Sequence, residues 1–184
     1  MAKLKMINKT YLDSNVIDQM KTSLAKNGFL RLDNFLDDKE YTSLLKELEK
    51  GKGKKLKVPD LYSYEKLDKL NGFSFKEFFD FINEFYRLKK RKINIKKFKW
   101  RDYTLLNDLD FWKKEYKSFY FVCKTWKSDF GGSLIYTDKK NKTLIFPVIG
   151  NSFFIVKTNE GKGKFVKYIN HLAKKRSFFL IEFE

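Results

Sequence analysis

The segment from Trp126 to Arg176 constrains the fold most, because short apolar runs alternate in it with turn-forming residues. Gly, Asn and Asp separate these runs, for example at Gly131-Gly132 and Gly150-Asn151. Runs of about four to six β-branched and aromatic residues, broken every eight to twelve positions or so, predict an antiparallel sandwich or barrel. No helix of normal length fits this segment. With the flanking residues, the expected strands are 98–106, 119–126, 133–138, 142–147, 152–158, 163–169 and 177–183.

The N-terminal part has a different pattern, in which apolar residues recur at helical spacing. Helices are predicted after residue 14, after residue 37 and after residue 74, with a short strand at 29–32 between the first two. Residues 50–60 are rich in Lys and Gly and predict a loop. The expected caps and stops are Ser14 or Asn15 with Gly28, Asp37 or Asp38 with Gly51, and a Ser74/Glu77 capping box.

The length of 184 residues fits one domain with a substantial core. We expect residues 1–96 to form a mainly helical buttress with basic loops, and residues 97–184 to be mainly strands. The 20 Phe, 10 Tyr and 3 Trp argue for a core packed with aromatic rings and against disorder.

The net charge is +17, from 40 Lys and Arg against 23 Asp and Glu. Such an excess attracts polyanions without regard to their sequence. The other interpretation is a Lys-rich proteome that covers its protein surfaces with Lys. Both stay open at this point.

The segment from Arg87 to Arg101 has nine basic residues and no acidic one. Together with Phe98 and Trp100 it is typical of a phosphate-facing patch with stacking rings. The alternative is a solvated turn that leads into a strand whose aromatic residues face the core. The residues predicted to form this patch are Arg87, Lys89, Lys90, Arg91, Lys92, Lys96 and Lys97.

Cys123 is the only cysteine, so the chain has no intramolecular disulfide and no site built from several thiolates. The N-terminus lacks an uninterrupted apolar segment, and no apolar run approaches the length that spans a bilayer. We therefore expect a soluble, cytoplasmic protein without a membrane partner.

Several motifs, taken in order, resemble the prolyl-hydroxylase-like branch of the 2-oxoglutarate/iron(II)-dependent oxygenases. These are Gly28 to Leu48, with Asp-Asn-Phe-Leu before an acidic-capped helix; Tyr103 to Asp108; Trp126 to Leu134, which reads W-x4-GG-x-L; Pro147 with Asn151-Ser152; and Arg176 before the last strand. The resemblance implies an α+β fold, a double-stranded β-helix of the jelly-roll or cupin type, with N-terminal helices packed on one sheet.

The same resemblance implies an iron site of two His and one carboxylate, with 2-oxoglutarate beside the metal. The chain has one His in total, so it cannot build that set. Alignment on the motifs places Asn107, Leu109 and Val166, or its neighbour Phe165, at the ligand positions. A shifted register recruits Asp108, Asp110 and His171 instead, a set that is chemically able to bind a divalent ion. The other possibility is that His171 is an ordinary hydrogen-bonded residue.

Arg176 lies near the position of the arginine that binds 2-oxoglutarate in the family. The resemblance makes Ser177 and Tyr103 its hydroxyl partners in an anion site, since a guanidinium binds carboxylates and phosphates in a bidentate manner. A basic surface turn formed by Lys174, Lys175 and Arg176 is the alternative.

Three functions follow from these observations. The leading hypothesis is a non-catalytic basic module, without a cofactor, that binds nucleic acid or a ribonucleoprotein. The second is a divergent active dioxygenase that uses iron(II) and 2-oxoglutarate to hydroxylate a protein. The third is a structural interaction domain whose charge reflects proteome bias.

Overall fold

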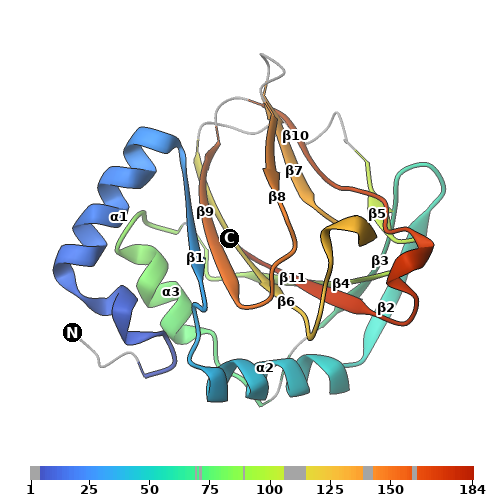
Figure 1. Ribbon diagram of the computed structural model, residues 1–184, viewed down its shortest axis with the longest axis horizontal. Coiled ribbons are helices and arrows are strands. Elements are labelled where there is room, and N and C mark those ends of the chain that lie inside the picture. The colour runs from blue at the N-terminus through green and yellow to red at the C-terminus, as the bar shows by residue number, and fades with distance from the viewer. Residues whose placement is uncertain are drawn as a thin grey trace.

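The computed structural model describes residues 5–68, 70, 72–88, 90–105, 115–138, 143–158 and 161–184. The helices α1, α2 and α3 lie in the first half of the chain (Figure 1), and short 3-10 helices lie near the N-terminus and in the second half. The helical segments are η1 (Lys9–Leu12), α1 (Ser14–Asn27), α2 (Asp38–Lys50), α3 (Lys76–Asn83), η2 (Ser128–Phe130) and η3 (His171–Ala173).

Within the described residues the strands form two sheets. The larger one has eight strands, with the order β1-β9-β6-β11-β4-β3-β2 and with β5 paired to β3; the smaller one has the order β10-β7-β8. The strands are β1 (Phe29–Asp33), β2 (Gly53–Val58), β3 (Tyr62–Leu67), β4 (Ile93–Lys99), β5 (Tyr103–Thr104), β6 (Glu115–Val122), β7 (Leu134–Asp138), β8 (Thr143–Phe146), β9 (Ser152–Thr158), β10 (Gly161–Val166) and β11 (Ser177–Phe183).

The path of the chain between the sheets defines a double-stranded β-helix. From β6 in the larger sheet it crosses to β7 and β8, returns to β9, crosses again to β10 and returns to β11. All strand pairs are antiparallel, as the short apolar runs of the sequence predicted. The predicted fold class, an α+β double-stranded β-helix, is confirmed.

The larger sheet is buried on both faces because its strands alternate between two cores. In β6, Tyr120 and Val122 pack in the core shared with the helices, whereas Phe119 and Phe121 pack in the core between the two sheets. The helices therefore cover one face of this sheet and the smaller sheet covers the other (Figure 1). The barrel interior is the space between the sheets.

The first half of the chain has more strand than we predicted. Residues 53–58, expected to be part of a loop, form β2, which pairs with β3 at the edge of the larger sheet. Lys at exposed positions of an edge strand discourages pairing with other chains, so the Lys content that suggested a loop is compatible with an edge strand. The expected strand at 98–106 is divided into β4 and β5 by a turn at Trp100 and Arg101.

Two of the predicted caps are wrong in detail. Asp13 caps α1, since its Oδ1 accepts hydrogen bonds from the N–H groups of Asn15 and Val16. The capping box at Ser74 does not form, because the Glu77 carboxylate accepts a hydrogen bond from the Met6 N–H at 2.8 Å. Both acids still satisfy free backbone donors, but the donors differ from those expected.

The glycine pair of the W-x4-GG-x-L motif has a structural role at the mouth of the barrel. Gly131 and Gly132 both have positive φ, and the Trp126 indole N–H donates to the Gly131 carbonyl at 3.0 Å. A Cβ on Gly131 would lie 2.2 Å from the Tyr168 carbonyl oxygen. Only glycine therefore fits where this segment passes Tyr168.

Among the described helices, none combines the length and the apolar character needed to span a bilayer.

Candidate functional site

Glu182 on β11 is a charged residue in the barrel interior. Alternation along β11 directs Phe179, Ile181 and Phe183 towards the helices and Phe178 and Leu180 into the barrel, and Glu182 has the barrel-facing parity. Its side chain is 7% exposed. A buried carboxylate requires partners, since transfer from water costs several kcal/mol or so when it is unpaired.

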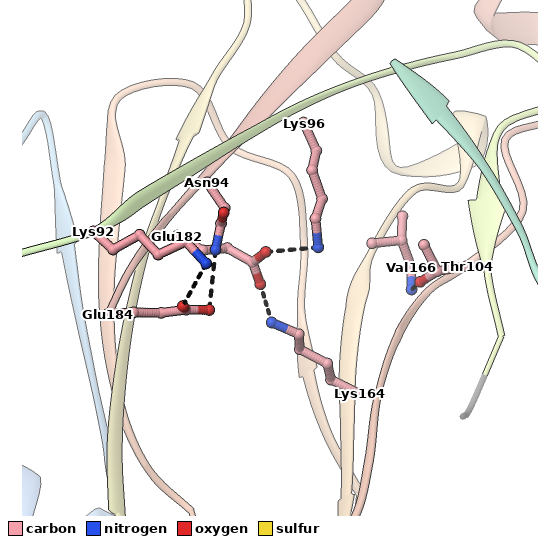
Figure 2. A network of polar contacts seen from close by, with 8 residues as sticks. All are labelled: Lys92, Asn94, Lys96, Thr104, Lys164, Val166, Glu182 and Glu184. Carbon is pink, nitrogen blue, oxygen red and sulfur yellow. Dashed lines mark hydrogen bonds and ion pairs between the residues drawn. The ribbon is translucent and has the colours of Figure 1, made fainter. Parts of the chain in front are cut away.

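Two lysines from opposite sheets supply those partners (Figure 2). Lys96 on β4 places its Nζ 2.7 Å from Oε2 of Glu182, and Lys164 on β10 forms an ion pair and hydrogen bond with Oε1. Both lysines are largely buried, with 21% and 17% of their side chains exposed. We call Lys96, Glu182 and Lys164 the barrel triad.

The electrostatics of the triad keep Glu182 ionised. Burial raises the pKa of this carboxyl, but the charges of Lys164 and Lys96 and their hydrogen bonds outweigh burial and lower the pKa to about 2. At neutral pH the triad therefore has two positive charges and one negative charge. The triad is therefore cationic overall, and its charges are paired with one another.

Neighbouring polar contacts extend from the triad towards the ends of the strands (Figure 2). Glu184 accepts a hydrogen bond from Asn94 at 3.0 Å and lies 3.8 Å from the Lys92 ammonium. On the other side, the hydroxyl of Thr104 on β5 accepts the Val166 N–H at 2.7 Å. This last bond joins β5 to β10 at the rim of the barrel.

A cavity of about 200 Å³ opens beside the triad. This volume is below the usual size of ligand pockets, which begin at roughly 300 Å³. The triad residues are its only charged lining residues in the part of the chain that the structure describes. The lining consists of Leu61, Tyr62, Tyr64, Lys96, Thr104, Leu105, Leu134, Lys164, Val166, Leu180 and Glu182.

The described residues around this cavity do not fit iron(II). Val166, predicted at a ligand position, lines the cavity with an isopropyl group, which donates no electron pair. The single His of the sequence, His171, lies exposed on η3 and does not line the cavity. The described residues contain no group of three His, Cys, Asp or Glu able to hold a metal. Asn107, Asp108, Leu109 and Asp110 lie outside the described residues.

The residues predicted for a 2-oxoglutarate-like anion site have different neighbours. The Arg176 guanidinium is exposed and lies 5.4 Å from the centre of the Phe130 ring. The Tyr103 ring lies 6.3 Å from that of Tyr168, and Ser177 pairs with Lys99 between β11 and β4. An anion site of Arg176, Tyr103 and Ser177 stays a prediction.

Among the described residues, the ammonium groups that line the barrel cavity are Lys96 and Lys164. We predicted Lys96 as part of a surface patch and did not predict Lys164 as a site residue. One signal was available in the sequence, because Glu182 is the single charged residue in the apolar run SFFLIEF. A charge on the buried face of such a strand indicates a buried partner of opposite sign.

The described residues of the predicted basic patch lie on different faces of the protein. Lys96 faces the barrel, whereas the Lys97 ammonium lies 5.5 Å from the Phe179 ring, on the face that the helices cover. Arg91 lies 3.6 Å from Asp80, and Lys92 contacts Glu184. Lys89 lies outside the described residues. Arg87 and Lys90 line a separate surface cavity of about 330 Å³, together with Tyr86, Tyr116 and Lys117.

The two aromatic residues of that segment also differ in accessibility. Phe98 is fully buried between the sheets, so it cannot stack on a ligand. Trp100 is 41% exposed, and the Arg101 guanidinium lies 4.5 Å from its ring centre. Of the two predicted stacking rings, only Trp100 is available at the surface.

Comparison with known proteins gives matches among solved structures alone. No family model and no curated protein sequence matches the chain. A prolyl hydroxylase from Trichoplax adhaerens, in complex with a hypoxia inducible factor peptide, superposes with a TM-score of 0.71 at 14% identity, over 95% of this chain and 91% of that one. A Pseudomonas putida prolyl-4-hydroxylase gives 0.68 at 10% identity, over 91% and 98%. A 2OG-Fe(II) oxygenase family oxidoreductase from Burkholderia pseudomallei gives 0.64 at 9%, over 94% and 92%.

The fold is therefore that of the 2-oxoglutarate/iron(II) oxygenases, and the similar structures include prolyl hydroxylases, as the sequence motifs indicated. At these identities the likeness establishes the architecture.

Proposed function

We propose that this protein is a non-catalytic binding module built on the oxygenase fold, and that its ligand is a nucleic acid or a ribonucleoprotein. The observation on which the proposal rests is the barrel triad. In this triad, the Glu182 carboxylate forms ion pairs with the two ammonium groups that line the barrel cavity.

Oxygenase chemistry needs a metal and an acid cosubstrate in the barrel. Two ammonium groups beside the cavity oppose the approach of a dication, and a second carboxylate must compete with Glu182 for them. Displacing Glu182 would leave its buried charge without partners, and leaving one member of a buried ion pair unpaired costs about 3–5 kcal/mol. Since the chain has one His, a two-His iron site is also excluded by composition.

The proposed ligand class follows from charge. A net charge of +17 produces a long-range attraction to polyanions and raises the rate of association with them. When a basic surface binds a phosphate backbone, condensed counterions are released from the nucleic acid, and this release favours binding.

A divergent active dioxygenase is the second candidate, because the structurally similar proteins are described as hydroxylases and oxygenases. Under this alternative, iron(II) and 2-oxoglutarate are the cofactors. A structural interaction domain is the third candidate, and it predicts neither activity nor polyanion binding.

Two titrations separate these functions. In the first, the anaerobic protein is mixed with iron(II) and 2-oxoglutarate, and the metal-to-ligand charge-transfer band is recorded beside that of an active prolyl hydroxylase. We expect no band for this protein, whereas a band of comparable intensity would show that iron(II) and 2-oxoglutarate bind and would favour the dioxygenase alternative.

In the second, retention on heparin and binding to a labelled oligonucleotide are measured at increasing salt. We expect binding that weakens steeply as the salt concentration rises. Failure to bind either polyanion at low salt would contradict the proposed function and favour a structural role.

A further inference from the structure

We propose that single-stranded nucleic acid binds to a surface formed by the turn between β4 and β5 and by the segment around η3; this inference rests on the proposed function. The surface consists of Trp100, Arg101, Tyr168, Lys174, Lys175 and Arg176, and we call it the Trp100 surface. It includes Trp100 and Arg101 from the end of the predicted basic segment, but none of the seven basic residues predicted to form the patch.

Backbone hydrogen bonds hold the two segments of this surface together. The Arg101 N–H donates to the Ile169 carbonyl at 3.0 Å, and the Ile169 N–H donates to the Asp102 carbonyl at 3.1 Å. Trp100 directly precedes Arg101, and Tyr168 directly precedes Ile169, so the pairing brings the two aromatic residues close together. Lys99 pairs with Ser177 between β4 and β11, which brings Arg176 to the same end of the sheet.

Asp102 fixes the turn that presents Trp100. Its side chain is 2% exposed and bonds to the Ser63 hydroxyl at 2.8 Å, to the Lys99 N–H at 3.0 Å and to the Lys55 ammonium. The Asp102 N–H closes the turn on the Lys99 carbonyl at 2.9 Å. The turn is thus held rigidly before any ligand arrives, which reduces the entropy lost on binding.

The aromatic rings of the surface are accessible. Trp100 is 41% exposed and Tyr168 is 51% exposed, whereas most large aromatic side chains of the described chain are buried. The Arg101 guanidinium lies over the Trp100 ring. Exposed rings that lie next to guanidinium groups are the platforms on which unpaired bases stack.

The charge of this surface is strongly positive. From Gly161 to Ile181 the sequence has no acidic residue, and Lys174, Lys175 and Arg176 are all exposed. Asp102 is paired with Lys55, so it does not neutralise the surface. Exposed acids near this surface include Asp60, which lines a cavity together with Tyr168, and Asp129 of η2, whose carbonyl accepts a hydrogen bond from Asn170. The four basic residues of the Trp100 surface outnumber these two acids.

Backbone conformation at two of the basic positions supports the same surface. Arg101 has φ 69° and Lys174 has φ 50°, and the other non-glycine residues with positive φ in the described chain are Asn34, Asp60 and Asn151. Asn and Asp tolerate this conformation, whereas Arg and Lys gain nothing from it. Long basic side chains are thus present at two turn positions where Gly or Asn is less strained.

A single strand fits this surface better than a duplex. Bases in a duplex are already stacked on each other, so exposed rings add little to duplex binding. Bases of a single strand stack on protein rings with an effect of roughly 1–3 kcal/mol each.

The test compares a labelled oligothymidylate with a duplex of the same length by fluorescence anisotropy. The variants are Trp100→Ala, Tyr168→Ala and the triple variant K174S/K175S/R176S. A charge-matched control is K52S/K54S/K57S, which removes three exposed lysines from β2 and the residues before it. Heparin retention is measured for every variant.

We expect each aromatic variant to weaken single-strand binding about tenfold and duplex binding less than about twofold. The triple variant should lower the salt slope of single-strand binding by about 2, at about 0.7 for each phosphate contact. The β2 control should leave the discrimination between single strand and duplex unchanged.

Different outcomes overturn different parts. Equal single-strand affinity of the wild type and Trp100→Ala, with heparin retention intact, would contradict the Trp100 surface and leave polyanion binding standing. Absence of all polyanion binding by the wild type would overturn both proposals.

If Trp100→Ala does not fold, Trp100→Phe replaces it. Oligothymidylate should quench tryptophan emission in the wild type and not in this variant. Equal quenching of the two proteins would contradict the assignment of Trp100 to the binding surface.

Discussion

Glu182 on β11 and Lys164 on β10 form an ion pair that joins the two sheets of the barrel from within (Figure 2). Lys96 on β4 completes the triad from the larger sheet. The similar structures are described as hydroxylases and oxygenases. In this protein, the barrel has an internal salt bridge next to its cavity. The first predictions concern this triad.

Replacing Glu182 by Gln should destabilise the protein by about 3–5 kcal/mol, because two buried ammonium groups lose their counter-charge. Urea unfolding at pH 7 measures the change. Glu184→Gln is the matched control: its side chain is 44% exposed, and we expect a loss below about 1 kcal/mol. Equal losses in the two variants would show that the buried triad contributes no more to the free energy of unfolding than an exposed ion pair does.

The stability of the wild type should depend on pH through Glu182. The pKa of this carboxyl is lowered from 4.5 to about 2 in the folded protein. Its stabilising effect is therefore fully present above about pH 4.5 and is lost as the pH falls towards 2, by roughly 3 kcal/mol in all. Glu182→Gln should lose less stability than the wild type between pH 5 and pH 3, as measured by urea unfolding. Parallel pH profiles would contradict the predicted pKa.

Gly131→Ala should destabilise the protein by more than about 3 kcal/mol. The new Cβ meets the Tyr168 carbonyl at 2.2 Å, in addition to the cost of positive φ for a residue with a side chain. Gly28→Ala is the control, since Gly28 also has positive φ but no atom lies within 4 Å of the new Cβ. Its loss should be about 1 kcal/mol. Similar thermal unfolding of the two variants would exclude the contact as the cause.

Asn151→Ala should cost roughly 3 kcal/mol or more, because this buried amide satisfies three groups at once. Its Oδ1 accepts from the Leu36 N–H at 2.9 Å and from the Tyr120 hydroxyl, and its Nδ2 donates to the Leu36 carbonyl at 2.9 Å. Tyr120→Phe removes one of these bonds and should cost about 1 kcal/mol. Denaturant unfolding of both variants gives the comparison, and a smaller loss for Asn151→Ala than for Tyr120→Phe would be incompatible with this network.

The sequence was sufficient for the fold because its signals are local. Short apolar runs broken by Gly and Asn indicated the antiparallel strands from β7 to β11, and helical periodicity indicated α1 and α2. The edge strand β2 was missed because an exposed, Lys-rich strand has the composition of a loop.

The candidate sites were harder to predict because they depend on which face of a strand a residue occupies. Lys96 and Lys97 are consecutive, yet one lies in the barrel and the other lies over Phe179. A count of basic residues along the chain cannot distinguish these positions. β10 and β11 lie in different sheets, and long-range packing decides which of their residues meet across the barrel. The partner of Glu182 was therefore not predictable from spacing.

The ionisation state of the Glu182 carboxyl is the most direct test of the barrel triad. It is measured by ¹³C NMR of the glutamate side chains, with Glu182→Gln for assignment. We predict that this carboxylate stays ionised from pH 7 down to pH 3 and that its resonance does not move when 2-oxoglutarate is added. A titration midpoint near 4.5, or a shift on addition of 2-oxoglutarate, would contradict the claim that Glu182 is held in ion pairs with Lys96 and Lys164.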